Sequence, residues 1–446
     1  MKDIKNNKVV TVIGAGLAGC EAALQLACRG IHVCLFEMRP NKQTDVHKTG
    51  NFAELVCSNS FKSKNPDSAA GCLKTELEAM GSFLLKAAYK TAVAAGGALA
   101  VDRDAFSSCV QSMIDENENI EVIREEVNEF PDGYCICATG PLTSEPLAKC
   151  IEEECGSTHL AFYDAAAPIV EADSINRDIV FAQSRYDKGD GADYLNAPFD
   201  KETYEAFWEE LINAQRVIEK DFERKELFAA CQPVEEVARS GMDALRFGAL
   251  KPVGLTDPRS GKRPWAAVQL RAENSNCTAY NLVGFQTNLR FGEQERIFRM
   301  IPGLENAEFS RFGVMHRNTF IDTPHCLTKT LALPNKPNIH FAGQLTGTEG
   351  YMEAVASGLF VALCVYAQMN DLQQPQLPKH TLFGSLLDYA TDSSVQDYQP
   401  MHVNYGILEP IEPKIRKKQQ RYAANAKRAR EELYKYIETR SDLFGK

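Results

Sequence analysis

Residues Val9–Glu37 read VVTVIGAGLAGCEAALQLACRGIHVCLFE, and this stretch alone predicts the fold class. A short apolar run meets three glycines spaced GxGxxG, a helical pattern then continues to Gly30, and a second apolar run ends at Glu37. The order strand, glycine turn, helix, strand is typical of a βαβ nucleotide-binding unit. We therefore expect an α/β protein with a Rossmann-type domain.

Each glycine of the turn has a physical role in this prediction. Gly14 makes the tight turn, Gly16 lets backbone amides approach a pyrophosphate, and Gly19 lets the helix pack closely on the strand. The phosphates would bind at the helix N-terminus, where unpaired N–H groups favour anions, and Glu37 would accept hydrogen bonds from a ribose. The predicted cofactor contacts of this unit are Gly14, Ala15, Gly16, Leu17, Ala18, Gly19 and Glu37. The motif by itself does not separate FAD from NAD.

Length and composition restrict the class of protein. A chain of 446 residues with 44% apolar residues allows two to three globular domains. It opens with MKDIKNNK and enters the first strand at once, so we expect no signal peptide. The longest uncharged apolar run, Val355–Asn370, is interrupted by Gly358 and is short for a bilayer. We expect a cytoplasmic protein with no membrane association and no obligate protein partner.

The cysteines and histidines indicate neither disulfides nor a metal site. Fourteen cysteines are spread over a long chain without an export signal, which favours reduced thiols. There is no CxxC pair, and the eight histidines form no ligand-spaced group such as HxxxH. We therefore expect no metal.

Two later segments favour FAD over NAD. Tyr134–Gly140 (YCICATG) reads as a buried strand that returns to the cofactor at Thr139 and Gly140, although a plain strand-to-turn junction has the same pattern. Near the other end, NIHFA at 338–342 runs into the glycine-rich GQLTGTEG at 343–350 and then into a helix. A second glycine turn at a helix N-terminus is expected in an FAD site and not in a single NAD domain. The predicted contacts here are Thr139, Gly140, Gly343, Gln344, Gly347, Glu349 and Gly350.

The middle of the chain has a different pattern. A polar, turn-rich stretch follows Phe181, then Lys201–Glu226 reads as a long charged amphipathic helix, and short strands alternate after it. We interpret this part as an inserted α+β domain. The predicted boundaries are 1–180 for the first part of the FAD-binding domain, 181–323 for the insertion, and 324–446 for the second part with a basic C-terminal helix.

Two cysteines are placed differently from the rest. Cys57 lies in ELVCSNS, a polar loop just beyond the cofactor unit, and Cys231 lies directly before a helix that a proline initiates. A thiolate beside a helix N-terminus is stabilised by the dipole. On the residues alone, the pattern favours an ordinary thiol in each case.

Several segments, in order along nearly the whole chain, resemble the TrmFO family of folate- and FAD-dependent RNA (uracil-5-)-methyltransferases. The segments that carry the resemblance are GAGLAGCEAA, ELVCSNS, ALAVDRDAF, LRFGALKPVGLTDPRSGKRPWAAVQLRAEN, GFQTNLRFGEQERIFRMIPGLENAEF, GVMHRNTF and FAGQLTGTEGYMEAVASG. Those of the inserted domain are more specific than the Rossmann motif. The chain is therefore identified as a member of this family.

The resemblance implies an activity. Methylenetetrahydrofolate would supply a one-carbon unit, FAD would carry it, and NADH or NADPH would supply the electrons, so that a uridine of RNA becomes 5-methyluridine. In most members the RNA is tRNA, methylated in the T-loop. By the same resemblance Cys57 and Cys231 are the catalytic pair, with Cys231 expected as the nucleophile, and His316 stacks on the folate pterin.

RNA would contact two basic regions. In the insertion these are Arg246, Lys251, Arg259, Arg263 and Arg271, and near the C-terminus they are Lys417, Lys418 and Arg421. The net charge of −11 argues against a general coat of nucleic acid, but Lys414–Arg430 holds eight basic residues and no acid. Any one of these side chains could also be a solvated charge.

One departure from the family leaves the RNA target open. The family pattern Phe-Glu-Gly-Cys is replaced here by Phe228-Ala229-Ala230-Cys231. A branch that methylates ribosomal RNA is one alternative, and a relative of the larger tRNA wobble-uridine modifying proteins is a second. A third, from another class, is a flavin-containing RNA-binding protein without turnover.

Overall fold

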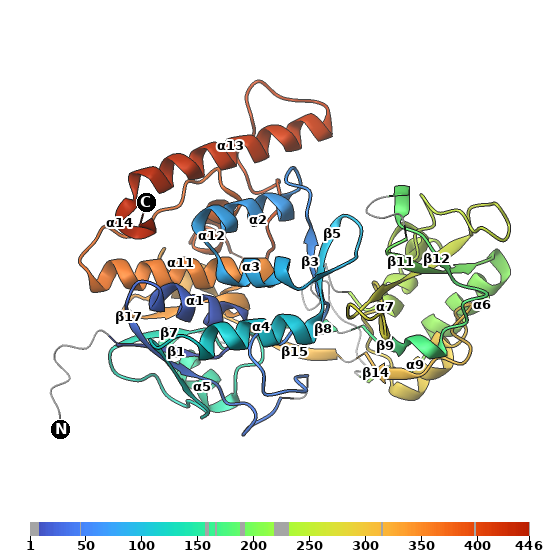
Figure 1. The fold of residues 1–446 in the computed structure, drawn as a ribbon, viewed down its shortest axis with the longest axis horizontal. Coiled ribbons are helices and arrows are strands. Elements are labelled where there is room, and N and C mark those ends of the chain that lie inside the picture. The colour runs from blue at the N-terminus through green and yellow to red at the C-terminus, as the bar shows by residue number, and fades with distance from the viewer. Residues whose placement is uncertain are drawn as a thin grey trace.

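The computed structural model describes residues 9–44, 46–156, 160–165, 167–187, 192–217, 232–313, 315–396 and 398–445. For 160–165, 187 and 315–317 it describes the backbone only. Figure 1 shows a larger α/β body that contains both ends of the chain and a smaller body formed by the middle of the chain. Cys231 lies outside the described residues, and His316 is described by its backbone alone.

A six-stranded sheet organises the larger body. Its order is β16-β17-β7-β1-β2-β6, with all neighbours parallel except β16 and β17. The bounds are β1 Val9–Ile13, β2 His32–Phe36, β6 Ile120–Ile123, β7 Tyr134–Cys137, β16 Ala332–Leu333 and β17 Lys336–Phe341. The chain thus returns to β1 late in the sequence, because β17 joins the sheet beside β7. This topology confirms the predicted Rossmann-type fold.

Helices bury both faces of this sheet in one apolar core. Helix α1 (Leu17–Ala27) is the crossover between β1 and β2, and α11 (Tyr351–Met369) packs along it. The other helices of this body are α2 Ala69–Met80, α3 Phe83–Lys90, α4 Arg103–Asp115, α5 Glu145–Cys155, α10 Thr323–Cys326, α12 Leu382–Ala390, α13 Lys418–Thr439 and α14 Ser441–Phe444. A small sheet of β3 Ser60–Ser63, β5 Ala98–Val101 and β4 Ala92–Val93 extends it toward the smaller body.

Within the described residues, α11 is the one helix long and apolar enough to cross a membrane. It is longer than the uncharged run at 355–370 suggested, because it begins at Tyr351. Most of its length is buried against α1 and the sheet. Its apolar composition is therefore that of a core helix.

The smaller body, here called the inserted unit, has its own antiparallel sheet and its own core. The strand order is β10-β11-β12-β13-β9-β14, with bounds β9 Ile169–Glu171, β10 Phe181–Ala182, β11 Tyr194–Phe199, β12 Ala266–Ala272, β13 Ala279–Leu282 and β14 Phe309–Arg311. Its α-helices are α6 Lys201–Asn213, α7 Val234–Arg239, α8 Ala244–Phe247 and α9 Phe291–Phe298. A two-stranded ribbon of β8 (Leu160–Ala165) and β15 (Met315–Phe320) lies where the chain enters and leaves this unit.

Two features of the inserted unit differ from the sequence-based expectation. Helix α6 ends at Asn213, well before Glu226, because the chain turns extended at Ala214 and Arg216 bridges to Leu289. Strand β9 pairs with β13 and β14 although it precedes residue 181. The sheet of this unit therefore starts upstream of the predicted boundary, while the boundaries 181 and 323 themselves stay predictions.

Candidate cofactor and active site

The early and late glycine segments lie against each other at the carboxyl ends of β1 and β17. A Cβ atom added at Gly343 would lie 3.1 Å from the Cβ of Ala18, and one at Gly358 would lie 2.2 Å from the Ala18 carbonyl oxygen. At Gly19 an added Cβ would lie 1.8 Å from the Gly14 carbonyl oxygen. These contacts leave no room for a side chain, so the glycines allow the close packing that the motif predicted.

The N-terminus of α1 is left open for an anion. The helix begins at Leu17 after Gly16, which has no side chain to cap the first turn, and a Cβ added at Gly16 would meet nothing within 4 Å. The amides at this end therefore face free space with the positive end of the helix dipole behind them. The Ala15 amide is used differently, because it donates to the Glu37 carboxylate at 3.0 Å.

Glu37 is held in its ionised form by Arg39. The two side chains are 5% and 2% exposed, and the Arg39 Nε donates to Glu37 Oε1 at 2.9 Å. Burial acts to raise the pKa of Glu37, but the bonds from Arg39 and the Ala15 amide hold it below its ordinary value. Arg39 also forms an ion pair with Glu54 at 3.1 Å, so the positive charge of the arginine is shared between two carboxylates. The carboxylate accepts four hydrogen bonds, from the amides of Ala15 and Arg39 and from Arg39 Nε and Nη2, so a ribose hydroxyl would share its oxygens with Arg39.

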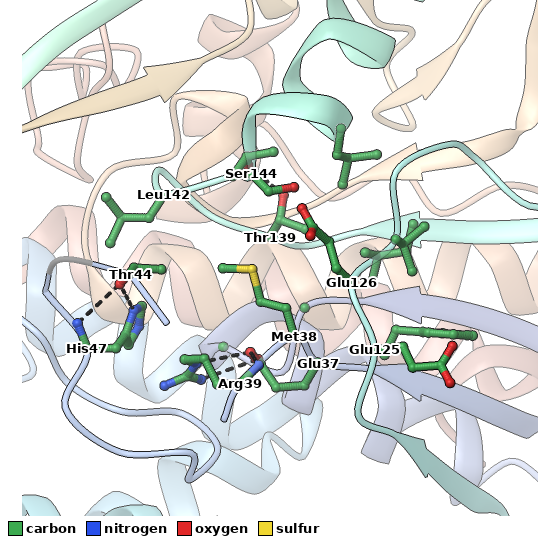
Figure 2. Close-up of a pocket in the computed structure, with 17 residues that line it drawn as sticks. Glu37, Met38, Arg39, Thr44, His47, Glu125, Glu126, Thr139, Leu142 and Ser144 are labelled. Atoms are coloured by element: carbon green, nitrogen blue, oxygen red, sulfur yellow. Dashed lines mark hydrogen bonds and ion pairs between the residues drawn. The ribbon is translucent and has the colours of Figure 1, made fainter. Parts of the chain in front are cut away.

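Gly14, Gly16 and Glu37 line a pocket at this edge of the sheet (Figure 2). Across it in that view lie Thr139, Glu126 and Ser144, from the segments before and after β7. The full lining is Ile13, Gly14, Gly16, Phe36, Glu37, Met38, Arg39, Thr44, His47, Glu125, Glu126, Val127, Thr139, Leu142, Thr143, Ser144 and Leu147. An open glycine turn, a helix N-terminus and a buried ionised carboxylate fit the adenosine diphosphate half of FAD.

The late glycine segment is shaped by close contacts of its own. The backbone φ of Gly347 is +72°, and a Cβ added there would lie 2.3 Å from the Tyr398 hydroxyl oxygen. Gln344 donates to Glu349 at 2.6 Å, and Gly350 leads into α11 without a side-chain cap. The start of α11 is thus a second helix N-terminus without a side-chain cap, at the end of a glycine-rich segment, and can face an anion.

Cys57 is tethered to this second helix N-terminus. The backbone amides of Cys57 and Ser58 donate to the hydroxyl oxygen of Tyr351, the first residue of α11, at 3.0 and 3.1 Å. Burial, and then a charge on Cys57, raise the pKa of Tyr351, so the phenol stays neutral. The Cys57 side chain is half-buried. The fold therefore brings one predicted cysteine to the end of the late glycine segment.

Three arginines surround the loop that carries Cys57. Arg103, at the start of α4, and Arg311, from β14, donate to the Cys57 carbonyl oxygen at 3.1 and 3.0 Å. Arg271, from β12, donates to Ser58 Oγ at 2.8 Å and to the side chain of Asn59 at 2.7 Å. Two of the three come from the inserted unit, which therefore contacts the loop directly.

The other two predicted groups cannot be placed in the same way. Helix α7 begins at Val234, after Pro233, as the proline-initiated pattern predicted. Glu235, the second residue of this helix, is buried and accepts a hydrogen bond from the Asn288 amide at 2.7 Å. Burial raises the pKa of Glu235 to about 7. His316 lies on β15, with its backbone paired to Asp164 of β8. The roles of Cys231 and His316 stay predictions.

The predicted RNA contacts of the inserted unit fall into two groups. Lys251, Arg259 and Arg263 are exposed, and Arg246 is half-buried with its guanidinium 3.7 Å from the centre of the Trp265 ring. Arg271 is 6% exposed and occupied by Ser58 and Asn59, so it does not belong to this exposed basic surface. Sequence density alone could not separate it, because β12 is buried along its whole length.

The basic C-terminal residues lie on the other body. Lys417 and Lys418 are exposed at the start of α13, and Arg421 is half-buried with a 3.4 Å bond to the Ile415 carbonyl. Figure 1 shows that the opposite end of α13, beside α14, is the one farther from the inserted unit in that view. The basic end is therefore on the same side of the larger body as the inserted unit.

Sequence analysis missed four side chains that shape the site: Arg39, Arg103, Arg311 and Tyr351. A signal existed for Arg39, since it follows the predicted ribose-binding acid by two positions. Tyr351 directly follows the predicted Gly350, so its position beside the cofactor site could also have been predicted. No sequence signal connects Arg311 to Cys57, because only the packing of the inserted unit joins them.

A group of possible metal ligands also escaped the spacing rules. His32, Cys34 and Glu121 present their ligand atoms within 4.8 Å of one another on the neighbouring strands β2 and β6. They come from two strands far apart in sequence, so no short motif marks them. The group is partly exposed and lies outside the lining of the pocket in Figure 2.

The fold and the site define the class of protein. A parallel sheet with a glycine turn, a buried ionised acid and a second glycine segment is the FAD-binding arrangement of Rossmann-type flavoproteins. Among solved structures, GidA from Aquifex aeolicus in the form I crystal matches with a TM-score of 0.70 at 16% identity, covering 97% of this chain and 78% of that one. This likeness shows the fold.

The sequence comparisons identify the family. A sequence model of glucose inhibited division protein A (GIDA) matches residues 9–373. The methylenetetrahydrofolate--tRNA-(uracil-5-)-methyltransferase TrmFO of Acetivibrio thermocellus is 52% identical over 429 residues, covering 96% of this chain and 98% of the relative. That of Symbiobacterium thermophilum is 51% identical, covering 94% and 95%. The chain belongs to the glucose inhibited division protein A family and, within the proteins compared, to TrmFO.

Proposed function

We propose that this chain methylates carbon 5 of a uridine in tRNA, in the T-loop, and so produces 5-methyluridine. Methylenetetrahydrofolate is the one-carbon donor, FAD the carrier and reductant, and NADH or NADPH the electron source. The single observation that carries the proposal is the 3.0 Å contact between the Cys57 amide and Tyr351, which tethers a half-buried thiol to the cofactor site. The names of relatives about half identical over nearly the whole chain support the same reaction.

The reaction needs two groups from the protein. Carbon 5 of uracil is a poor nucleophile until a thiolate adds to carbon 6, which moves electron density onto carbon 5. After the new carbon–carbon bond forms, a base must remove the carbon 5 proton, so that the carbon 6–sulfur bond can break and release the thiolate. When bound, FAD supplies the transfer of the one-carbon unit and the two electrons that reduce it to methyl. NAD(P)H replaces those electrons.

Two cysteines suit these two roles. We assign Cys231 as the thiolate that adds to carbon 6 and Cys57 as the second, proton-handling group. The test is a covalent complex with tRNA that carries 5-fluorouridine, since fluorine at carbon 5 cannot be removed as a proton. Trapping should be lost in Cys231→Ala and kept in Cys57→Ala. The reverse pattern would exchange the two roles.

We further propose that His316 stacks on the pterin of the folate donor. An imidazole plane beside a flat heterocycle excludes water and fixes the angle of approach. His316→Ala should then bind methylenetetrahydrofolate more weakly while flavin reduction by NAD(P)H stays intact. Normal folate affinity with slow flavin reduction would contradict this role.

The RNA surface combines the exposed bases of the two bodies. Lys251, Arg259 and Arg263 of the inserted unit would contact phosphates on one side, and Lys417 and Lys418 on the other. A protein with an overall charge of −11 that binds RNA needs such local reversals of sign. The reaction would take place in the cytoplasm, where tRNA and folate cofactors occur together.

The experiment that tests the function is a methylation assay of the FAD-loaded protein. Methylenetetrahydrofolate, NADH or NADPH, and unmodified tRNA should yield 5-methyluridine, detected by nucleoside mass spectrometry. A parallel reaction with ribosomal RNA should yield none, because the relatives are named for tRNA. A protein that binds FAD and tRNA without any product would instead be a binding protein without turnover.

A further inference from the structure

The carbonyl oxygen of Cys57 receives two guanidinium groups at once. Arg103 Nη2 donates to it at 3.1 Å and Arg311 Nη2 at 3.0 Å. Arg311 also donates to the preceding carbonyl, that of Val56, at 3.2 Å, and Arg103 donates to the carbonyl of Leu55. The two guanidinium groups therefore donate hydrogen bonds to three consecutive carbonyl groups of the loop, from two directions.

The two forks come from different bodies of the molecule. Arg103 lies at the first turn of α4 in the larger body, while Arg311 is the last residue of β14 in the sheet of the inserted unit. Glu273, which directly follows β12, pairs with Arg103 across the same boundary. The position of the Cys57 loop is thus set by how the inserted unit sits on the cofactor-binding body.

Arg311 keeps its charge in an unfavourable place. Burial and then the neighbouring Arg103 lower the pKa of Arg311 to about 10, and its buried Nε has no hydrogen-bond partner among the described residues. At neutral pH the guanidinium is nevertheless charged. A negative charge on Cys57 acts to raise the pKa of Arg311, Arg103 and Arg271 alike, so all three guanidinium groups lie close to this side chain.

We infer that Arg311 is a positioning residue for Cys57: from the inserted unit it binds the Val56 and Cys57 carbonyls, and so fixes where the loop and its thiol lie on the cofactor-binding body. The inference rests on the proposed function for the use of that thiol, but not for its placement. Arg311 reaches the thiol through the backbone of the loop and has no assigned contact with RNA or cofactor.

Thiol alkylation tests this directly and does not depend on methylation. Trypsin releases Thr49–Lys62 as a peptide with Cys57 as its single cysteine, so iodoacetamide labelling of this thiol can be timed by mass spectrometry. In the FAD-loaded protein, Arg311→Gln should speed the labelling by about three- to ten-fold, because a loop that has lost one of its two arginine contacts opens more often and exposes its half-buried thiol.

Two further variants separate charge from geometry. Arg311→Lys keeps the charge, but one ammonium cannot bridge two carbonyls, so this variant should also label faster than wild type. Its kcat for methylation should therefore fall on the order of ten-fold, with KM for tRNA unchanged. Arg299→Gln is the matched control, because Arg299 also binds a carbonyl, that of Ala307, through two N–H groups, and should label like wild type.

The outcomes are distinct. Wild-type labelling in folded Arg311→Gln would overturn the positioning role, and so would wild-type labelling and wild-type kcat in Arg311→Lys. If Arg311→Gln does not fold, the Arg311→Lys measurement still decides. A protein that shows the labelling effect but makes no 5-methyluridine would refute the proposed function and leave the role of Arg311 intact.

Discussion

Glu37 is a carboxylate that burial alone would drive toward its neutral form, yet the ribose site needs it ionised. Arg39 resolves this conflict, because its fork binds Glu37 and its charge is shared with Glu54. The lowered pKa of Glu37 is the result. The acid at the end of β2 is therefore an arginine-supported acceptor, and its geometry is set before any ligand arrives.

The first prediction concerns this acceptor. Glu37→Gln should weaken FAD binding by about ten- to hundred-fold, because a charged hydrogen-bond acceptor for the ribose is lost and Arg39 loses a partner. Flavin fluorescence during titration of the apoprotein measures the affinity. Glu121→Gln, on the neighbouring strand β6 but outside the pocket, is the control and should bind FAD normally. Equal affinity in both variants would contradict the ribose role.

At the scale of elements, the packing of α11 on α1 joins the two ends of the chain. Gly358 lies where an added Cβ would be 2.2 Å from the Ala18 carbonyl oxygen, and the Ser357 hydroxyl accepts from the Gly343 amide at 2.6 Å. The same contact that fills the core also places the late glycine segment beside the early one. Core stability and cofactor geometry are therefore coupled at this interface.

The second prediction uses this coupling. Gly358→Ala should lower the free energy of unfolding by about 1–3 kcal/mol and weaken FAD binding, because the added methyl group forces α11 away from α1. Urea denaturation and flavin titration measure the two effects. Gly292→Ala is a matched change in helix α9, where an added Cβ meets nothing within 4 Å, and it should be neutral or slightly stabilising. Wild-type FAD affinity in Gly358→Ala would show that core stability and cofactor binding are not coupled at this interface.

Helices α2 and α12 are joined by a buried carboxylate. Glu76 of α2 accepts from the backbone amides of Leu382 and Phe383, the first two residues of α12, at 2.7 and 3.1 Å. Burial raises the pKa of Glu76 from its ordinary 4.5 to about 7. The folded protein thus holds a proton on this group over a pH range in which the unfolded chain has lost it.

The third prediction follows from the sign of that shift. The stability that the proton contributes is complete below pH 4.5 and is lost as the pH rises to about 7, an interval worth about 3 kcal/mol. The urea midpoint of the wild type should therefore fall, relative to that of Glu76→Gln, as the pH rises from about 5 to 8. Glu78→Gln, exposed on the same helix, should show no such change. A difference independent of pH would contradict the raised pKa.

At the scale of the whole molecule, exposed basic residues lie on both bodies. The exposed set is Lys251, Arg259, Arg263, Lys417 and Lys418. They belong to segments separated by more than a third of the chain, and Figure 1 shows that the end of α13 away from α14 is the one nearer the inserted unit in that view. A folded RNA that contacts both sets would present one uridine between them.

The fourth prediction tests this surface. The double change Lys417→Glu with Lys418→Glu should weaken tRNA binding by about ten-fold or more and reduce the slope of log affinity against log salt by about one to two, because two phosphate contacts are lost. Filter binding at several salt concentrations measures both quantities. The double change Lys149→Glu with Lys336→Glu, on α5 and β17, alters the net charge equally and serves as the control. An equal loss of tRNA affinity in both double variants would show that net charge, and not a local phosphate contact, determines the binding.

Local patterns were sufficient for the fold class because they are set by neighbours in sequence. The glycines at 14, 16 and 19 and the apolar strands around them determine a βαβ unit without help from the rest of the chain. The end of the helix predicted at 201–226 could not be read in this way. Helical periodicity continues past Asn213, but the pairing of Arg216 with the distant Leu289 ends the helix.

The sequence by itself determined the nucleotide-binding turn, the preference for FAD and the family, because each depends on short-range order or on a quoted motif. The tertiary structure alone decided that Arg271 is buried and that Arg103 and Arg311 meet at the Cys57 carbonyl. Contacts of this second kind join residues up to 254 positions apart. Their formation depends on the docking of whole elements, whose burial energy is shared over many side chains and leaves no local signature.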